Sequence, residues 1–172
     1  MRYSGKQVIH PGVRARDLPA LMELYELNYI QLRQLIPEVD LLQDHVVSSV
    51  KGALNLYLTV RERCKYTTTL HLSYRFDGDE GSSLAPDIVV RLYHDAQVAE
   101  VISRGKGRGR KASGFDRFHY DYPIEARWQV NRFLQKWLGF CLRHGHSFSP
   151  AREQFDQALE TLEIDRIASF ES

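Results

Sequence analysis

Side chains that could carry out chemistry gather in two short stretches of the chain, near positions 94–100 and 119–121. The first stretch holds His94, Asp95 and Glu100, and the second holds His119 and Asp121. Imidazoles and carboxylates together could bind a divalent metal or perform acid–base chemistry. Their spacing matches no known ligand motif, and nothing in the sequence alone brings the two stretches together. His94-Asp95 is equally suited to a turn, and Asp121 to a helix cap.

We therefore predict no metal site and no cofactor, and treat this region as a candidate ligand-binding site. A β-sheet would hold several of its side chains rigidly. The candidate residues are Arg91, Tyr93, His94, Asp95, Glu100, His119, Tyr120 and Asp121.

A second candidate site is the run SRGKGRGRKASG, which begins at Ser103. Glycine alternates there with cations, so we predict a flexible basic loop. Its cations are Arg104, Lys106, Arg108, Arg110 and Lys111. The loop could contact phosphates, and the aromatic residues after it could stack on bases. The alternative is a solvated loop that keeps a sheet edge charged. Nucleic-acid binding here would be weak, sequence-tolerant and lost by about 200 mM salt.

Hydrophobic periodicity predicts the elements that position these residues. Apolar residues three and four apart predict a helix from about Asp17 to Ile36, with Asp17 as its N-cap. Its core-facing stripe comprises Leu21, Leu24, Tyr25, Asn28, Leu32 and Leu35. A second helix is predicted from about Pro123 to near Gly145, capped by Asp121 or Tyr122. Its stripe comprises Val130, Phe133, Leu134, Trp137, Leu138 and Cys141.

Between these helices the period changes to two, which predicts strands between His45 and Ser103. The segment FDGDEGSSLAP, at positions 76–86, has the composition of a surface loop. Asp87–Val101 is predicted to be a hairpin. If Asp95-Ala96 is its turn, Arg91 faces Glu100 across the strands and could form an ion pair with it.

Strands between two helices, with connections too short for crossover helices, indicate an α+β fold rather than a parallel sheet. We predict an antiparallel meander sheet of about five strands packed against an N-terminal and a C-terminal helix. The expected organisation is a flexible basic tail at 1–16, a single α+β domain at 17–147, and an acidic amphipathic helix or tail at 148–172.

Composition limits the functional classes. The 172 residues carry a formal net charge of +1, which argues against a nucleic-acid binder that uses its whole surface. Cys64 and Cys141 are far apart and are expected to be reduced thiols. No apolar run has the length of a membrane helix, so we expect a cytoplasmic protein without membrane contact. Six aromatic side chains are expected in the core; they are Phe115, Phe118, Tyr120, Tyr122, Trp128 and Trp137.

Four segments resemble a known family. They are YELNYIQLRQLIP at Tyr25–Pro37, VVRLYHDAQVAEV at Val89–Val101, HYDYP at His119–Pro123 and QVNRFLQKWLGFCLRHG at Gln129–Gly145. In these segments the chain is similar to the YqiB-like family, a group of small uncharacterised proteins of Gram-negative bacteria. The resemblance covers roughly Leu18 to His146 and implies a cytoplasmic bacterial protein. It assigns no catalytic role to any residue.

No recognisable catalytic arrangement is present in the sequence, so the leading hypothesis is a non-enzymatic binding or adaptor domain. Its partner would be an unknown protein, bound through the sheet, the basic loop or the acidic C-terminal segment. One alternative is a small nucleotide- or metal-using enzyme or regulator with a site around Arg91, His94, Asp95 and His119. Another is weak, nonspecific nucleic-acid binding through the basic loop at 104–111. The first alternative requires Arg91, His94 and His119 to converge in one pocket.

Overall fold

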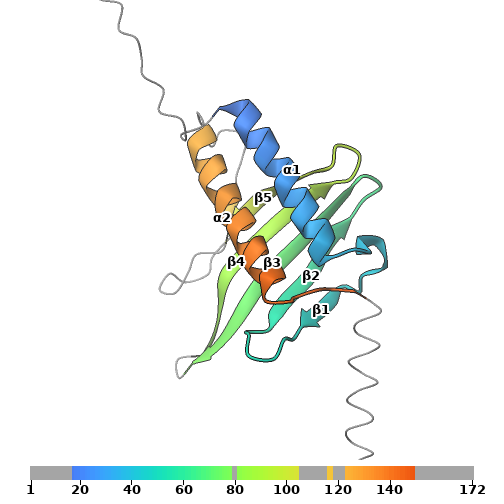
Figure 1. Cartoon of the computed structure of the whole chain (residues 1–172), viewed down its shortest axis with the longest axis vertical. Coiled ribbons are helices and arrows are strands. Elements are labelled where there is room, and N and C mark those ends of the chain that lie inside the picture. Colours follow the sequence, from blue (N-terminus) through green and yellow to red (C-terminus); the bar gives the residue numbers. More distant parts are fainter. Residues whose placement is uncertain (1–16, 79–80, 105–115, 118–122, 150–172) are drawn as a thin grey trace, which may run out of the picture.

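Two helices lie side by side on one face of an antiparallel sheet (Figure 1). The computed structural model describes residues 17–78, 81–104, 116–117 and 123–149. In chain order the elements are α1 (Leu18–Leu35), the 3-10 helix η1 (Val39–Leu41), β1 (His45–Ser48), β2 (Leu56–Arg63), β3 (Thr67–Gly78), β4 (Gly81–Tyr93), β5 (Val98–Arg104), β6 (Asp116–Arg117) and α2 (Ile124–Arg143).

The sheet is a meander in which every strand pairs with the next one in the sequence, in the order β1-β2-β3-β4-β5-β6. All pairings are antiparallel, and the two described residues of β6 pair with Ser103 and Arg104. The predicted α+β fold is therefore confirmed. Antiparallel neighbours arise because the connections are short, and a short connection can only return the chain beside the strand it has left.

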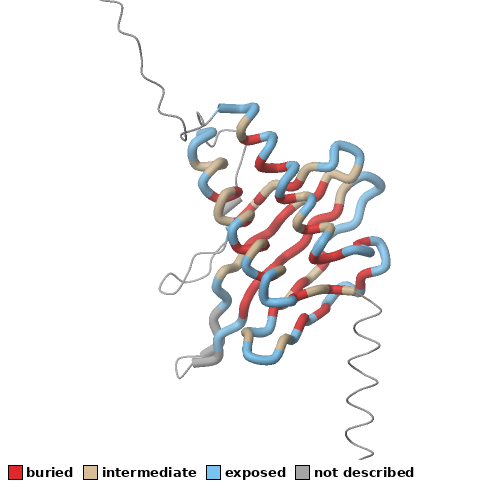
Figure 2. Tube along the Cα trace, viewed as in Figure 1, coloured by how far each residue is buried: buried red, intermediate tan, exposed pale blue. Residues whose placement is uncertain are grey.

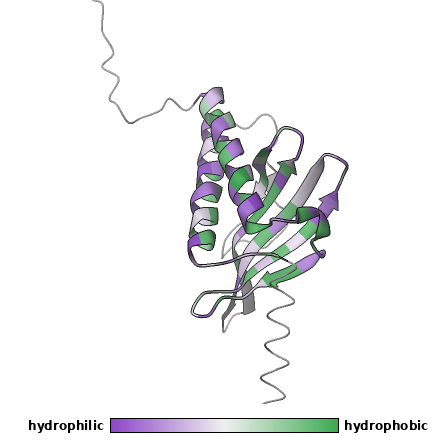
Figure 3. Cartoon of the chain, turned by 45° about the vertical axis from the view of Figure 1, so that its right-hand side comes forward, coloured by the Kyte–Doolittle hydropathy of each residue, from purple (hydrophilic) through white to green (hydrophobic). Residues whose placement is uncertain are grey.

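Helix α1 buries the stripe that its periodicity predicts. Its buried residues are Leu21, Leu24, Tyr25, Asn28, Leu32 and Leu35. Asp17 is the N-cap, and its Oδ1 accepts a hydrogen bond from the Ala20 backbone N–H at 2.9 Å. Figure 3 shows hydrophobic and hydrophilic residues alternating around both helices, as expected for helices that face a core on one side only.

Helix α2 supplies the other half of the helical layer. Leu134 is fully buried and Trp137 is 7% exposed, so both predicted core positions are confirmed. The helix begins one residue later than expected, because Pro123 is its N-cap rather than Asp121 or Tyr122. Gly145 follows the helix with φ of +83°, a left-handed conformation that glycine adopts without strain.

The segment at 76–86 was predicted to be a loop, and this prediction is wrong. Strand β3 continues to Gly78 and β4 begins at Gly81, so most of this segment forms paired strands. Phe76, for example, pairs with Ser83. Glycine, serine and aspartate disfavour strands locally, but backbone hydrogen bonds do not depend on the side chain. Two long strands that are already in register extend their pairing through such residues.

The core lies between the helices and the strands beneath them, where buried residues concentrate (Figure 2). After α2 the chain returns to this layer. Phe148 is buried, and its backbone N–H bonds the Leu35 carbonyl at 2.8 Å. Cys64 is exposed and Cys141 is buried, and both are free thiols. Burial raises the pKa of the Cys141 thiol, which keeps it protonated and unreactive.

Candidate functional site

Successive side chains point to opposite faces of a strand, so residues that do not face the helices share the other face of the sheet. On β3 and β4 these residues lie side by side in the strand register: Thr69, His71, Ser73, Asp87, Val89 and Arg91. We call this surface, together with Arg61 and Glu62 of β2, the helix-free face. It carries most of the polar contacts that link neighbouring central strands.

A β-bulge in β2 brings Glu62 onto this face. Strict alternation would place Glu62 on the same side as the buried Val60. The register shifts between Val60, which pairs with Leu70, and Glu62, which pairs with Thr69. The extra residue, Arg61, shifts the alternation by one position, so the Glu62 side chain points away from the core. The bulge therefore places one cation and one carboxylate beside Thr69.

His71 and Asp87 form a hydrogen-bonded pair at the centre of the helix-free face. The His71 Nε2 contacts Asp87 Oδ1, and the two side chains are only 11% and 17% exposed. Arg61 Nη2 lies 3.5 Å from the opposite ring nitrogen, Nδ1. A guanidinium has only donors, so Nδ1 accepts from Arg61 and Nε2 carries the proton directed at Asp87. Both ring nitrogens are thus engaged within the protein, which suits positioning of Arg61 better than proton transfer.

Arg91 is held on the same face by β2 and β3. Its Nε donates to Thr69 Oγ1 at 3.2 Å, and its Nη2 lies 3.5 Å from Glu62 Oε2. Arg91 does pair with Glu100 in the backbone register, as predicted. The ion pairs of these two residues nevertheless go to other partners, because the bulge presents Glu62 to Arg91 and Glu100 turns to helix α2.

Glu100 lies at the edge of the sheet and joins strands to helices. Its Oε1 accepts from the Tyr93 hydroxyl at 2.8 Å, and its Oε2 lies 3.4 Å from Arg127 Nη2. The same Arg127 nitrogen donates to the Tyr25 hydroxyl of α1 at 3.0 Å. Burial, followed by the charge of Glu100, raises the pKa of Tyr25 to about 12. Burial and the hydrogen bond to Glu100 likewise raise the pKa of Tyr93 to about 12.

These pKa values predict a loss of stability at alkaline pH. The unfolded chain releases each tyrosine proton near pH 10.0, whereas the folded protein retains it to about 12. The folded state then binds more protons, so the free energy of unfolding falls as the pH rises through this interval. We expect Tyr25→Phe to make the decline shallower in denaturant melts at several alkaline pH values. Tyr66→Phe, which changes an exposed tyrosine, should retain the wild-type slope, and an identical slope in Tyr25→Phe would contradict the assignment.

A buried asparagine pair lies next to this edge. Asn28 of α1 donates through Nδ2 to Asn131 Oδ1 of α2 at 3.3 Å. The same Oδ1 accepts the Val101 backbone N–H of β5 at 3.0 Å. Asn131 Nδ2 donates to the Arg127 carbonyl at 2.9 Å. One side chain thus connects both helices to β5 at a backbone donor that points out of the sheet.

His94 lies on the opposite side of the sheet from Arg91. Its Nε2 is 2.8 Å from Thr68 Oγ1, and its ring meets that of Tyr29 in α1 edge to face, with centroids 6.3 Å apart. His94 and Asp95 belong to a four-residue turn at 94–97 that connects β4 to β5. Gln97 closes this turn with φ of 54°, an uncommon value for a residue other than glycine.

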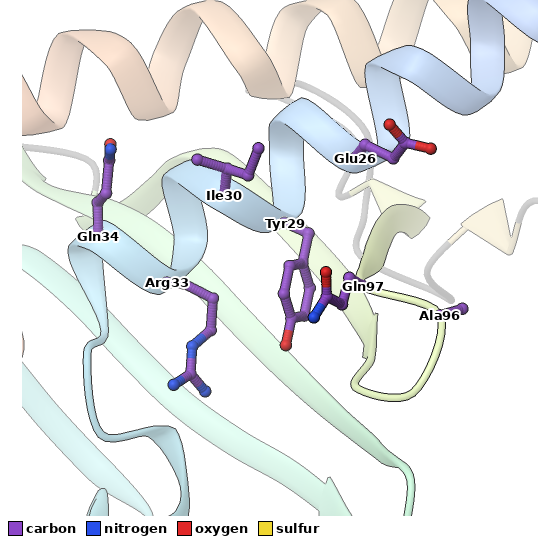
Figure 4. A pocket seen from close by; sticks show the side chains of 7 residues that line it. All are labelled: Glu26, Tyr29, Ile30, Arg33, Gln34, Ala96 and Gln97. Carbon is purple, nitrogen blue, oxygen red and sulfur yellow. The ribbon is translucent and has the colours of Figure 1, made fainter.

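An open groove of about 600 Å³ lies between this turn and α1. Its lining residues are Glu26, Tyr29, Ile30, Arg33, Gln34, Ala96 and Gln97. Figure 4 shows Tyr29 and Arg33 pointing from α1 toward the sheet, with Gln97 beside the Tyr29 ring. The Arg33 guanidinium donates to the Pro37 carbonyl at 2.9 Å, so it is already committed to the end of the helix. We assign the groove no chemistry of its own.

The structure brings only some of the predicted site residues together. Tyr93 and Glu100 are in contact, and Arg91 is their neighbour, opposite Glu100 in the strand register and in contact with the Tyr93 hydroxyl. His94 is separated from them by the thickness of the sheet. The remaining candidates lie outside the described residues; they are His119, Tyr120, Asp121, Lys106, Arg108, Arg110 and Lys111. Within the described ranges, no group of three or more His, Cys, Asp or Glu side chains could hold a metal ion.

Sequence reasoning missed the residues at the centre of the helix-free face, namely Arg61, Glu62, Thr69, His71 and Asp87. Alternation alone does place Thr69 and His71 opposite the apolar residues of their strand. It does not reveal that Asp87, sixteen positions later, is paired beside them. The contact between His71 and Asp87 can be predicted only when the register of β3 against β4 is known.

The comparisons with known proteins agree on one family. Residues 31–147 match the model of a family described as protein of unknown function (DUF1249). This chain belongs to the DUF1249 family. The Escherichia coli K12 protein described as "Uncharacterized protein YqiB" is 38% identical over 135 residues, covering 75% of this chain and 91% of the relative. Proteins with the same description from Escherichia coli O6:H1 and O157:H7 match to the same extent. No solved structure matches.

The predicted YqiB-like resemblance is thus confirmed, and the DUF1249 match contains most of the contacts described above. It includes the helix-free face, Glu100 and Asn131, but begins after Tyr25 and Asn28. Among the described residues, no helix combines the length and the apolar character that a membrane span requires.

Proposed function

We propose that this DUF1249 protein is a non-enzymatic binding domain that receives an acidic segment of a protein partner on its helix-free face. The observation that carries the proposal is the placement of Arg61 and Arg91 on two strands that flank Thr69. Their backbones are about 10 Å apart, which is twice the spacing of neighbouring strands. Guanidinium groups bind carboxylates through two parallel hydrogen bonds, so two of them suit a segment that carries successive acids.

The residues that surround these two arginines support the binding of an acidic segment. His71 and Asp87 hold Arg61 from one side, and Glu62 holds Arg91 loosely, with side-chain exposures of 36% for Arg91 and 54% for Glu62. Such an exposed ion pair contributes at most about 1 kcal/mol, so a partner carboxylate can displace Glu62 at little cost. Preorganised arginines lose less side-chain entropy on binding than free ones.

The enzyme alternative receives less support. It needs Arg91, His94 and His119 in one pocket, but Arg91 and His94 lie on opposite faces of the sheet. His119 lies outside the described residues. His71 uses both ring nitrogens within the protein and offers no free base to a substrate.

The proposal predicts that removing both arginines abolishes capture of the partner. The tagged protein would be used to recover partners from its native cells, with nucleic acid digested in a parallel sample. We expect Arg61→Ala with Arg91→Ala to reduce recovery of the partner by about tenfold or more, because two charge-assisted contacts are lost. Denaturant melts of the variant establish that it remains folded.

The matched control also removes two cations. Lys51→Ala with Lys65→Ala changes exposed residues in turns and should recover the partner as the wild type does. Equal recovery by the arginine variant would overturn the proposal. So would nuclease sensitivity of the partner whose recovery depends on Arg61 and Arg91, since this face would then bind nucleic acid.

A further inference from the structure

Charge is distributed unevenly along this nearly neutral chain. Residues 104–147 contain ten Arg or Lys residues and only three Asp or Glu residues, whereas the whole chain has a formal net charge of +1. The rest of the chain is therefore acidic. Such segregation concentrates positive charge in this segment of the chain, which contains helix α2.

Helix α2 displays part of this charge as a stripe. Arg132, Lys136 and Arg143 are separated by four and seven residues, so they project from the same side of the helix. This side is opposite the buried Leu134, Trp137 and Cys141. Along the helix axis the three cations are about 6 Å and about 10 Å apart.

Arg104 extends the stripe onto the end of β5. Its guanidinium carbon lies 4.9 Å from the centroid of the Phe133 ring, in a cation–π contact that positions the charge beside α2. We call Arg104, Arg132, Lys136 and Arg143 the basic stripe. Phe140 is exposed on the same helix, and its ring lies 3.9 Å from that of His144, so an aromatic pair adjoins the cations.

Where the structure describes side chains, no carboxylate forms an ion pair with the basic stripe. None of its four members takes part in an ion pair there; Arg132 contacts only an amide oxygen, Gln135 Oε1. The acidic residue in the first turn of α2, Glu125, accepts from Gln129 Nε2 at 2.9 Å. Solvated helix faces usually mix both signs, because oppositely charged residues four apart stabilise a helix and like charges destabilise it. The one acid of α2, Glu125, lies on this side too, but seven residues before Arg132, so no cation of the helix has an acid four residues away that could pair with it. The three cations beyond Glu125 therefore favour an anionic partner.

We propose that the basic stripe binds the phosphate backbone of single-stranded nucleic acid, without reading its sequence. The intervals between the cations are comparable to one and two steps between successive phosphates of an extended strand. The Phe140–His144 pair adds a surface on which a base can stack. A membrane fits less well: helices that bind membrane surfaces insert an apolar face, and α2 buries its apolar face against the sheet. This inference is independent of the proposed function.

The test is a titration of a labelled oligothymidylate of about 15 nucleotides with the full chain, followed by fluorescence anisotropy at several salt concentrations. Contacts with three to four phosphates predict a slope of about −2 to −3 in the logarithm of affinity against the logarithm of salt. Arg132→Gln with Lys136→Gln should weaken binding at low salt and make the slope shallower by about 1.4. Glutamine retains helix propensity, so α2 should remain folded.

Two further variants keep the inference falsifiable. Lys51→Gln with Lys65→Gln removes the same charge elsewhere and should leave affinity and slope unchanged. Replacing Lys106, Arg108, Arg110 and Lys111 with serine tests the neighbouring segment of the chain. No binding by the wild type at low salt would overturn the inference. Unaltered binding by the Arg132/Lys136 variant would also overturn it, and so would loss of binding only in the serine variant.

Discussion

Replacing Trp137 with alanine is expected to lower the free energy of unfolding by about 3–5 kcal/mol, as other large core truncations do. The Trp137 indole is nearly inaccessible to solvent and lies between two aromatic rings. It meets Tyr74 edge to face with centroids 5.5 Å apart, and it stacks on Phe133 at 6.5 Å. Alanine would leave a cavity between α2 and β3 that both neighbours border. Denaturant melts of the wild type and the variant measure the difference.

Phe140→Ala is the matched control for this prediction, because it removes another aromatic ring from the same helix. Phe140 is exposed, so its loss should cost less than about 1 kcal/mol. If Trp137→Ala also cost less than about 1 kcal/mol, α2 would not pack on the sheet as described.

Replacing Asn131 with alanine should cost about 2–4 kcal/mol, although only a small polar group is lost. The Asn131 amide is 1% exposed and bonds Asn28, Val101 and Arg127. Alanine leaves the buried Val101 N–H without its acceptor, and such an unsatisfied group costs about 1–3 kcal/mol. The Asn28 amide keeps the Asn131 backbone carbonyl, so the lost side-chain hydrogen bonds to Asn28 and Arg127 add about 1 kcal/mol. Denaturant melts measure the total. Amide exchange at Val101, which should become faster, measures the local effect at the sheet edge.

A double-mutant cycle provides the control. Asn28→Ala removes one of the partners of Asn131, so the double variant Asn28→Ala/Asn131→Ala should cost less than the sum of the two single variants, by about 1 kcal/mol. Strict additivity would show that the two asparagines do not stabilise each other across the helices. A loss below 1 kcal/mol for Asn131→Ala would show that Val101 finds another acceptor.

The segments that carry the family resemblance meet at this edge of the sheet. Asn28 lies in the first, Glu100 and Val101 in the second, and Asn131 in the last. Their contacts join α1, β5 and α2, so part of what resembles the family maintains the architecture. Of the arginines of the proposed binding face, Arg91 lies in the second segment, opposite Glu100, whereas Arg61 lies outside all of them. Variants at Arg61 and at Asn131 can therefore separate the binding role from the structural one.

The sequence alone determined the two helices, the change of period between them and the antiparallel class of the sheet. All six residues of the predicted α1 stripe are buried, including the polar Asn28. Such predictions succeed because the direction of a side chain depends on the backbone geometry of its own helix or strand. The pairing of Arg91 with Glu100 was also accessible, since a short turn determines the register of a hairpin.

Only the tertiary structure decided which polar side chains share a surface. His71 and Asp87 meet because β3 and β4 pair in one register, which neither strand encodes by itself. The bulge at Arg61 moves Glu62 to the opposite face, which strict alternation would not predict. Periodicity follows from local geometry, whereas a shared surface depends on register, bulges and turns that form only when the strands pair.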